Sequence, residues 1–413
     1  MVRSGDYGCA AQLRSILTER RYLDMKFGVL KDIKIGESRV IATPAEVSEI
    51  LRDGHEVYVA SGAGFKAGFD DDEYAAAGAI IKETNEEIYA TCDFVAKVKE
   101  IEPSEYDYLR EGQIIYTCIH PAAHKGEVDA LLEKKVIAIT AEDSHRYGSP
   151  NCEAAGKVGA FMGLWSMMTM NGGSGKFANG LAGTPGVRAI VCGCGTVGRA
   201  AIEVLSNMGV QVTVADINMG SLKEVSALYN GKIDTMISNN FNLKTALPNT
   251  DLFINSVRWP KNATEPMVTR EMVASMKRGS VIVDISNDYG CIETFHETTL
   301  EDPTYIEEGV VHYCVSNMPS AIAGATSVSY ATGVLPHLRN ILNKGLETAC
   351  AQDGYLRRSL TCYKGYLTHE ETSGIQGRPW VQPEVILGIT DRQLDPAPKT
   401  TVTVSDNFYP EFK

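Results

Sequence analysis

Short apolar runs alternate with amphipathic segments along most of this chain. The apolar runs predict β-strands at residues 26–30, 56–60, 94–98, 114–119, 135–140, 187–193, 210–215, 251–257, 280–286 and 310–315. Between many of them, apolar residues recur at helical spacing, as in TPAEVSEILRDG, EVDALLEK, GRAAIEVLSNMG and TREMVASMKRG. Strands that alternate with helices in this way are typical of parallel sheets with helices on both faces. The pattern therefore predicts an α/β protein.

Local signals add boundaries to this pattern. Thr43 before Pro44 predicts the start of a helix, and Gly54 predicts its end. The glycine-rich segment 171–186, NGGSGKFANGLAGTPG, follows a predicted helix over 153–168. We interpret this segment as a hinge or connector between two α/β halves.

The stretch VRAIVCGCGTVGRAA, residues 187–201, carries the most specific motif. Gly193 permits a tight turn after the strand, Gly195 lets the backbone approach a pyrophosphate, and Gly198 lets the next helix pack closely. Asp216 follows at the end of a second apolar strand, VQVTVAD. This order of strand, turn, helix, strand and acid predicts a bound dinucleotide. Asp216 favours NAD over NADP because a carboxylate accepts from the ribose 2′-OH and repels a 2′-phosphate.

The composition argues against several other classes of protein. The 413 residues include 52 acidic and 39 basic ones, and the net charge of −13 disfavours nucleic acid or an anionic membrane as a partner. No apolar run reaches membrane-spanning length and the N-terminus lacks the apolar core of a signal peptide, so we expect a cytoplasmic protein. The ten cysteines form no CxxC pair and no cluster with histidines. We expect buried, reduced thiols and no metal site.

Polar residues also stand at the predicted carboxyl ends of strands, where an α/β sheet binds its ligands. They are Arg39, the pair Lys97 and Lys99, His120, and the pair Asp284 and Asp288. The two lysines alternate on the run FVAKVKE, which predicts that both face the same side of a strand. Each residue also has an ordinary structural reading, as a surface charge or a satisfied core histidine. Together they supply cations for a carboxylate, an imidazole for proton transfer and an acid beside a nicotinamide.

Long stretches between Met25 and about Gly388 resemble the alanine dehydrogenase family. That family also includes the NAD-binding subunit of transhydrogenase and N5-(carboxyethyl)ornithine synthase. The matching stretches are MKFGVLKDIKIGESRVIATPAEV, GHEVYVASGAG, VKVKE, LREGQIIYTCIHPAA, EAAGKVGA, the glycine motif with VADIN, VTREMVASMKRGSVIVDISNDYGCIET and VVHYCVSNMP.

The resemblance implies roles for individual residues. It places the carboxylate-binding arginine on Arg39, the substrate lysine on Lys99, the general acid and base on His120, and the aspartate at the nicotinamide on Asp288. A family serine that contacts phosphate or ribose is Cys152 here, whose thiol donates more weakly. The other implied cofactor contacts are Thr196, Val197, Asp216, Ser238, Val257, Val315, Asn317 and Met318.

Other departures from the family concern the substrate pocket. A basic residue beside the adenosine ribose is replaced by Ser221. The family's GAVLIPG loop reads NSVRWPK, which puts Arg258 and Trp259 near the nicotinamide, and Tyr289 follows Asp288. Arg258 either binds a second carboxylate of the substrate or faces solvent at the rim. The sequence leaves both readings open.

The resemblance and the alternation together predict two Rossmann-like domains, with parallel sheets flanked by helices and with cofactor and substrate in the cleft between them. A helix that starts at Ala331 is expected to return to the first domain and dock there. The expected division is an N-terminal extension (1–24), the first part of the substrate domain (25–150), the NAD-binding domain (151–321), a return to the substrate domain (322–390) and a C-terminal tail (391–413).

The leading hypothesis is an NAD-dependent dehydrogenase of the alanine dehydrogenase type, which deaminates a 2-amino acid or aminates a 2-oxo acid. Arg39 and Lys99 would bind the carboxylate, with Arg258 as a further contact, and His120 would move the proton. A second hypothesis is an N-(carboxyalkyl)amino acid dehydrogenase, in which an amino acid replaces ammonia. A third is a non-catalytic NAD-binding or transhydrogenase-like subunit, against which the intact catalytic positions argue. We expect small-molecule partners and a homo-oligomer, either a dimer or a hexamer.

Overall fold

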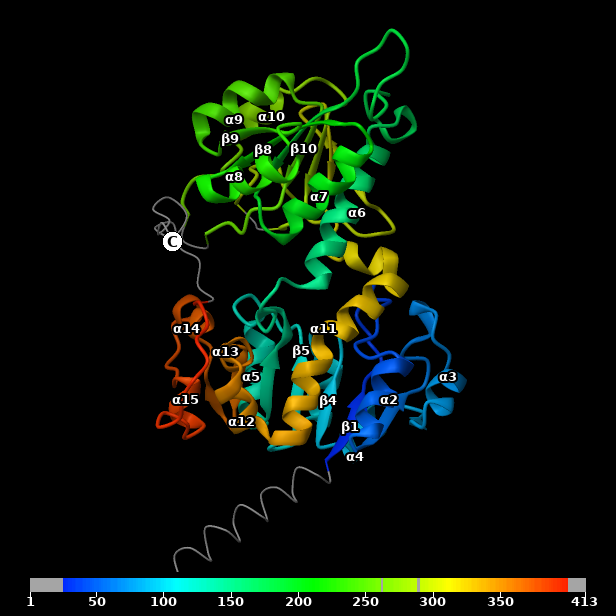
Figure 1. Cartoon of the computed structure of the whole chain (residues 1–413), viewed down its shortest axis with the longest axis vertical. Helices are drawn as coiled ribbons and strands as arrows, with labels where there is room; N and C mark the ends of the chain where they lie inside the picture. Colours follow the sequence, from blue (N-terminus) through cyan, green and yellow to red (C-terminus); the bar gives the residue numbers. More distant parts are fainter. Residues whose placement is uncertain (1–24, 261–262, 288–289, 400–413) are drawn as a thin grey trace, which may run out of the picture. The chain divides into compact units, whose positions relative to one another are not determined.

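The computed structural model describes residues 25–260, 263–287 and 290–399. These residues divide into two compact units (Figure 1). The first unit contains the described residues up to Tyr147 and those from Ala323 onward, and the second runs from Gly148 to Ile322. Within the described residues, the chain therefore leaves the first unit once and returns to it.

The first unit is built on an eight-stranded sheet with the order β15-β14-β6-β5-β4-β1-β2-β3. The strands from β6 to β3 pair in parallel, whereas β14 pairs antiparallel with both β6 and β15. Strands β4 and β5 are buried along their whole length, as expected for central parallel strands. The strands are β1 (Lys26–Val29), β2 (Glu56–Ala60), β3 (Ile80–Lys82), β4 (Phe94–Ala96), β5 (Ile114–Thr117), β6 (Ile137–Thr140), β14 (Leu360–Tyr363) and β15 (Tyr366–Leu367).

Helices α2 and α11 show how local sequence sets the ends of elements in this unit. Thr43 Oγ1 accepts from Ala45 N at the start of α2, and Gly54 has φ +97° just after its end, so both predicted boundaries are confirmed. The helix predicted from Ala331 begins earlier, at Ala323. The helices are α2 (Pro44–Arg52), α3 (Asp71–Ala76), α4 (Asn85–Thr91), α5 (Lys125–Glu133), α11 (Ala323–Lys344), α12 (Leu346–Gln352), α13 (Gly354–Arg358), α14 (Glu370–Gln376) and α15 (Pro383–Ile386), with 3₁₀ turns η1 (Phe65–Ala67), η2 (Pro103–Tyr108) and η3 (Ala141–Asp143).

The returning helix α11 makes specific polar contacts with residues on either side of α2. Arg339 donates from Nε and Nη2 to the two carboxylate oxygens of Asp53, each at 2.6 Å. Val40 N donates to Ser327 Oγ at 3.0 Å. These contacts, together with the apolar residues of α11 in the core, attach the returning segment to the first sheet.

The second unit is built on a seven-stranded sheet with the order β12-β13-β11-β10-β7-β8-β9. All neighbours are parallel except the edge strand β12. The order reverses at β7, which makes the carboxyl end of β7 the point where such sheets bind ligands. The strands are β7 (Arg188–Cys192), β8 (Gln211–Asp216), β9 (Asp234–Ile237), β10 (Leu252–Asn255), β11 (Val281–Asp284), β12 (Thr304–Glu307) and β13 (Val310–Tyr313).

Helices α6 and α7 of the second unit pack unusually closely. A Cβ on Gly156 would lie 2.2 Å from the carbonyl oxygen of Val197, so only glycine fits at this crossing. The helices are α6 (Pro150–Ser166), α7 (Thr196–Asn207), α8 (Met219–Leu228), α9 (Asn240–Ala246) and α10 (Arg270–Ala274), with 3₁₀ turns η4 (Thr169–Asn171), η5 (Leu247–Asn249) and η6 (Met318–Ile322).

Every apolar run that predicted a strand contains one, but β3, β9, β12, β14 and β15 were not predicted. Strands β3, β9 and β12 are short and partly exposed, so no continuous apolar run marks them. Strands β14 and β15 form a hairpin across Lys364 and Gly365, which both have positive φ. No signal in the sequence separated this hairpin from a loop.

The interpretation of segment 171–186 as a hinge between two halves is wrong, because the segment lies inside the second unit. Ser174 N donates to Gly279 O at 2.9 Å, which ties the segment to the same sheet. Its glycines allow close backbone packing. A Cβ on Gly173, for example, would lie 2.3 Å from the main chain of Met167.

Candidate functional site

Strand β7 leads directly into the predicted glycine turn. Gly193 has φ +100°, a conformation that residues with a Cβ rarely adopt. A Cβ on Gly198 would lie 2.0 Å from the carbonyl oxygen of Gly193, whereas a Cβ on Gly195 would meet no atom within 4 Å. Helix α7 begins at Thr196, and its N-cap Gly195 supplies no side-chain cap. The first-turn N–H groups of α7 can therefore bind an anion.

Asp216 ends β8 beside this turn. Its Oδ2 accepts from Cys194 N at 2.7 Å, and its Oδ1 accepts from Asn218 N at 2.7 Å. Asn218 in turn caps α8 by accepting from Gly220 N and Ser221 N. Two backbone N–H groups thus fix the carboxylate in place, and each of its oxygens keeps a second lone pair for a ligand.

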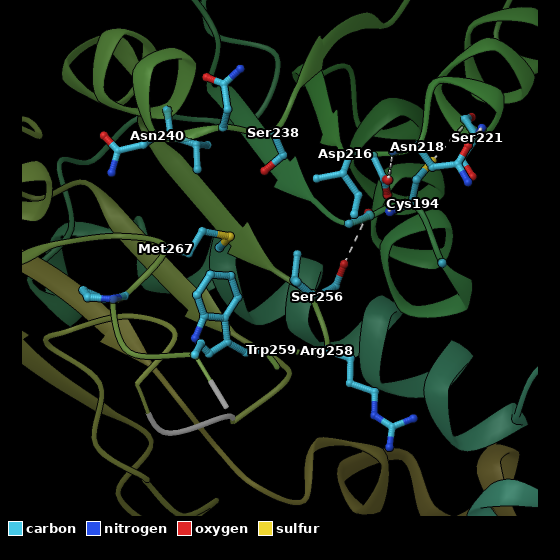
Figure 2. Close-up of a pocket in the computed structure, with 18 of the residues that line it drawn as sticks. Cys194, Asp216, Asn218, Ser221, Ser238, Asn240, Ser256, Arg258, Trp259 and Met267 are labelled. Atoms are coloured by element: carbon cyan, nitrogen blue, oxygen red, sulfur yellow. Dashed lines mark hydrogen bonds between the residues drawn. The ribbon is translucent and has the colours of Figure 1, made fainter. Parts of the chain in front are cut away.

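The turn and Asp216 open onto a cavity of about 800 Å³ (Figure 2). Trp259 and Met267 lie close together on one side of it, and the Arg258 side chain extends away from Trp259. Among the predicted contacts to cofactor and substrate, this cavity is lined by Gly193, Gly195, Asp216, Ser238, Val257 and Arg258. The cavity also has walls that the motif did not predict, formed by Leu243, Ser256, Pro266 and Met267 among others.

The other predicted cofactor contacts do not line this cavity. They are Cys152, Thr196, Val197, Gly198, Val315, Asn317 and Met318. Thr196 and Val197 form the first turn of α7, and Cys152 lies in the first turn of α6, where burial raises the pKa of its thiol. Val315 and Met318 are buried beyond the end of β13. Their contacts with a cofactor remain predictions.

Asp288 and Tyr289 lie outside the described residues. Asp284 is buried at the end of β11, where its Oδ1 accepts from Asn255 Nδ2 at 3.0 Å and from Ser286 N at 3.1 Å. These contacts hold the loop that follows β11.

Polar residues of the first unit lie at the carboxyl ends of its central strands. Arg39 is buried, and its Nε donates to Glu37 Oε1 at 2.8 Å while its Nη2 donates to Glu37 Oε2 at 2.5 Å. Glu37 Oε1 also accepts from Arg39 N at 2.8 Å. This bidentate pair fixes the plane of the guanidinium group.

The strand predicted over 94–98 ends at Ala96, so the two lysines of this run do not alternate on a strand and that prediction is wrong. Lys97 is fully buried, with Nζ 2.7 Å from Glu105 Oε2 and 3.6 Å from Asp32 Oδ1. Two carboxylates therefore compensate the buried ammonium group, which explains a cation in the core without any ligand.

Glu100 connects the predicted substrate lysine with the predicted acid–base histidine. Its Oε1 lies 3.5 Å from Lys99 Nζ and 3.8 Å from His120 Nε2, and its Oε2 accepts from Lys34 Nζ at 2.7 Å. Burial raises the pKa of Glu100, but Lys99, His120 and Lys34 together lower it to about 2. An ionised carboxylate therefore stays beside these groups at neutral pH.

His120 follows β5 and has φ +48°, a left-handed conformation that is uncommon for a residue with a side chain. Its N–H donates to Glu142 Oε1 at 2.7 Å, and its Nδ1 lies 3.3 Å from the same oxygen. Desolvation lowers the pKa of His120 below its ordinary value, and Lys99 and His124 act in the same direction. The carboxylates of Glu142 and Glu100 oppose this shift.

Sequence reasoning missed the carboxylates of this cluster. Glu37 and Glu100 stand within two residues of a predicted cation, a spacing that could have marked them. Glu142 is 22 residues from His120 along the chain, and its only signal is the end of a predicted strand. Three carboxylates thus accompany the three predicted groups Arg39, Lys99 and His120.

Within the described ranges, no group of three or more His, Cys, Asp or Glu side chains is arranged to hold a metal ion. All cysteines of the described part of the chain are free thiols, and all of them except Cys152 are buried. No helix among the described residues is long and apolar enough to cross a membrane.

Two family descriptions match this chain over most of both units. Residues 28–149 match "Alanine dehydrogenase/PNT, N-terminal domain", and residues 160–370 match "Alanine dehydrogenase/PNT, C-terminal domain". The chain belongs to the alanine dehydrogenase/PNT family. The predicted resemblance, the two-domain α/β architecture and the prediction of a dehydrogenase enzyme are confirmed with it.

Similar proteins support the same family over nearly their full length. An alanine dehydrogenase of Methanococcus maripaludis is 35% identical over 371 residues, which cover 88% of this chain and 100% of the relative. One of Bilophila wadsworthia is 38% identical over 367 residues, covering 86% and 97%. A solved L-alanine dehydrogenase superposes with a TM-score of 0.80 at 32% identity, covering 86% of this chain and 99% of that one. A transhydrogenase from Sinorhizobium meliloti, 21% identical with a TM-score of 0.69 over 84% of this chain and 99% of its own, shares the fold.

Proposed function

We propose that this chain is an NAD-dependent dehydrogenase that acts on the C–N bond of a 2-amino acid, with alanine as the first substrate to test. The observation that carries this proposal is the glycine turn with Asp216 fixed beside it at the mouth of a cavity of about 800 Å³. A volume of this size falls within the range of cofactor sites. Relatives named alanine dehydrogenase, matched along almost their whole length, support alanine as the amino acid.

The residues present fit NAD. The open space over Gly195 leaves room for a pyrophosphate, and the first turn of α7 offers N–H groups to it. The Asp216 carboxylate can accept from a ribose 2′-OH and would repel a 2′-phosphate. When bound, NAD supplies the acceptor for the hydride that leaves the substrate Cα. We assign Thr196, Val197, Ser238 and the other implied contacts to the same cofactor.

In this proposal, Arg39 and Lys99 bind the substrate carboxylate. Glu37 keeps the Arg39 guanidinium in one plane, which suits a planar carboxylate partner. His120 takes the proton of the water that attacks the imine and returns it in the opposite direction. Asp288 is assigned to the substrate amine on the family resemblance alone.

A second candidate is an N-(carboxyalkyl)amino acid dehydrogenase, and one observation favours it. Arg258 lines the cavity in a loop where the family has aliphatic residues, and a cation there suits a larger substrate with a further carboxylate. Substrates of either kind are small molecules. We also propose a homo-oligomer in the cytoplasm, which gel filtration coupled to light scattering and cell fractionation would test.

A screen of NADH oxidation distinguishes these candidates. Each 2-oxo acid is offered first with ammonia and then with ornithine, lysine or alanine as the amine. Rapid oxidation with pyruvate and ammonia supports alanine dehydrogenase activity, and oxidation only with an amino acid amine supports the second candidate. If no pair is turned over while NADH still binds, the chain is a non-catalytic NAD-binding subunit and the proposed function is wrong.

A further inference from the structure

Glu142 and His120 lie at the ends of neighbouring strands in the first unit. Strand β5 pairs in parallel with β6, with Thr117 opposite Thr140, and each strand ends at that residue. His120 follows β5 by three residues, and Glu142 follows β6 within the turn η3. The register of the sheet therefore brings these two residues together.

Glu142 contacts both the main chain and the ring of His120 through one oxygen. Its Oε1 accepts from His120 N at 2.7 Å and lies 3.3 Å from His120 Nδ1. The left-handed backbone of His120, with φ +48°, is strained by about 1 kcal/mol and persists only where neighbours compensate it. The hydrogen bond from Glu142 is such a compensation.

The other oxygen of Glu142 points to a role beyond holding a loop. Glu142 Oε2 is buried and has no hydrogen-bond partner among the described residues. An unsatisfied buried carboxylate oxygen costs free energy that a neutral side chain would avoid. A backbone N–H could be held equally well by an amide oxygen. The negative charge of Glu142 is therefore the feature that needs an explanation.

Four charged or titratable groups face the His120 ring: Glu142, Glu100, Lys99 and His124. An ionised carboxylate can only accept, so the oxygen of Glu142 near Nδ1 favours the tautomer with the proton on Nδ1. In neutral His120 the lone pair is then on Nε2, the nitrogen that lies 3.8 Å from Glu100 Oε1. Nε2 is thereby the nitrogen that can take a proton from a reactant.

We propose that Glu142 is a positioning residue that holds His120 in its left-handed conformation and keeps the proton on Nδ1, so that Nε2 acts as the base. The kinetic part of this inference rests on the proposed function, since it assigns His120 to proton transfer. The tautomer part concerns the protein alone. Two experiments test the two parts separately.

The first experiment is ¹⁵N NMR of the histidine rings in the ligand-free protein, with the His120 signals assigned by His120→Asn. The wild type should show neutral His120 protonated at Nδ1. In Glu142→Gln the amide oxygen can still accept from His120 N and still lies near Nδ1, but without the charge it attracts the Nδ1 proton less strongly, so the share of the Nε2-protonated form should rise. A wild-type ring protonated at Nε2, or a tautomer that Glu142→Gln leaves unchanged, overturns the inference whatever the enzyme's substrate is.

The second experiment is the pH dependence of kcat/KM for the amino acid that the screen identifies. Removing a negative charge beside an imidazole lowers its pKa, so Glu142→Gln should move the imidazole limb about one pH unit toward acid. Turnover should fall about tenfold, a part of the 10²- to 10⁴-fold that general acid–base catalysis typically contributes, with KM within about twofold. Glu142→Asp keeps the charge, so its imidazole limb should lie close to that of the wild type.

A matched control comes from the neighbouring carboxylate in the same turn. Asp143 Oδ2 lies 3.0 Å from His369 Nε2, so Asp143→Asn also breaks a carboxylate–imidazole pair in η3. In Asp143→Asn, the imidazole limb of the pH profile should lie at the same pH as in the wild type. An equal shift in both variants, or no shift in Glu142→Gln while the wild type is active, overturns the inference without touching the proposed function. Loss of all activity in the wild type itself refutes the proposed function instead.

Discussion

Asp216 offers the sharpest test of the cofactor assignment, because its carboxylate holds the glycine turn as well as the predicted ribose. In Asp216→Asn one of the two oxygens becomes an NH₂ group, which cannot accept from Cys194 N or Asn218 N. Whichever way the amide is placed, one of these 2.7 Å hydrogen bonds is lost. The negative charge that repels a 2′-phosphate disappears at the same time.

The size of the effect follows from these contacts. A hydrogen bond to a charged group contributes about 1.5–3 kcal/mol, which corresponds to roughly 10- to 100-fold in an equilibrium constant. We therefore expect the KM for NADH to rise by about that factor. The kcat/KM for NADPH should rise relative to that for NADH, and an added cation near the ribose should raise it further. We place this cation at Ser221, which lines the cavity, and not at Asn218, whose side chain caps α8.

The assay is the ratio of kcat/KM for NADH and NADPH with one fixed substrate pair. Asp216→Asn/Ser221→Arg should reverse the preference of the wild type, and Ser221→Arg alone should not, since the carboxylate remains. The melting temperature of each variant shows whether the turn is intact. A wild type that uses NADPH as well as NADH, or an unchanged ratio in Asp216→Asn, would refute the reasoning.

Three further predictions concern other residues. His120→Ala should lower turnover by roughly 10²- to 10⁴-fold with unchanged NADH affinity, and near-normal turnover at every pH would make His120 structural. Arg258→Leu should raise kcat/KM for pyruvate with ammonia, relative to larger substrates, by about one to two decades. An unchanged ratio would show that Arg258 only faces solvent. Burial holds the pKa of His312 at about 4 against 6.5 for a free imidazole, so the unfolded state binds more protons between these values. His312 should therefore contribute roughly 2 kcal/mol less to the free energy of unfolding in urea at pH 5 than at pH 7, and His312→Gln should reduce the pH dependence by this amount.

The dinucleotide turn could be predicted from sequence because its determinants are local. Gly193, Gly195 and Gly198 lie within six residues, and their roles depend on the backbone of the turn they form. Asp216 could be added because a strand must end beside the turn in a parallel sheet. The walls of the cavity, such as Leu243 and Met267, come from later loops and carry no such local signal.

The surroundings of the catalytic candidates could not be predicted in the same way. The contact of Glu142 with His120 depends on the pairing of β5 with β6, and the left-handed backbone of His120 has no glycine to announce it. The strand predicted over 94–98 ends earlier, at Ala96, for a related reason. Lys97 continues an apolar run because the carboxylates of Asp32 and Glu105 compensate its charge, and hydrophobic periodicity does not detect such partners.

These partners change the chemical picture of the first unit. Sequence alone predicted cations for a carboxylate, but Glu37, Glu100 and Glu142 accompany Arg39, Lys99 and His120. A cluster with balanced charges suits a 2-amino acid, which carries an ammonium group beside its carboxylate, better than it suits a simple anion. A second carboxylate on the substrate would find its charge less well compensated here. It would need a further cation, and Arg258→Leu tests whether Arg258 is that cation.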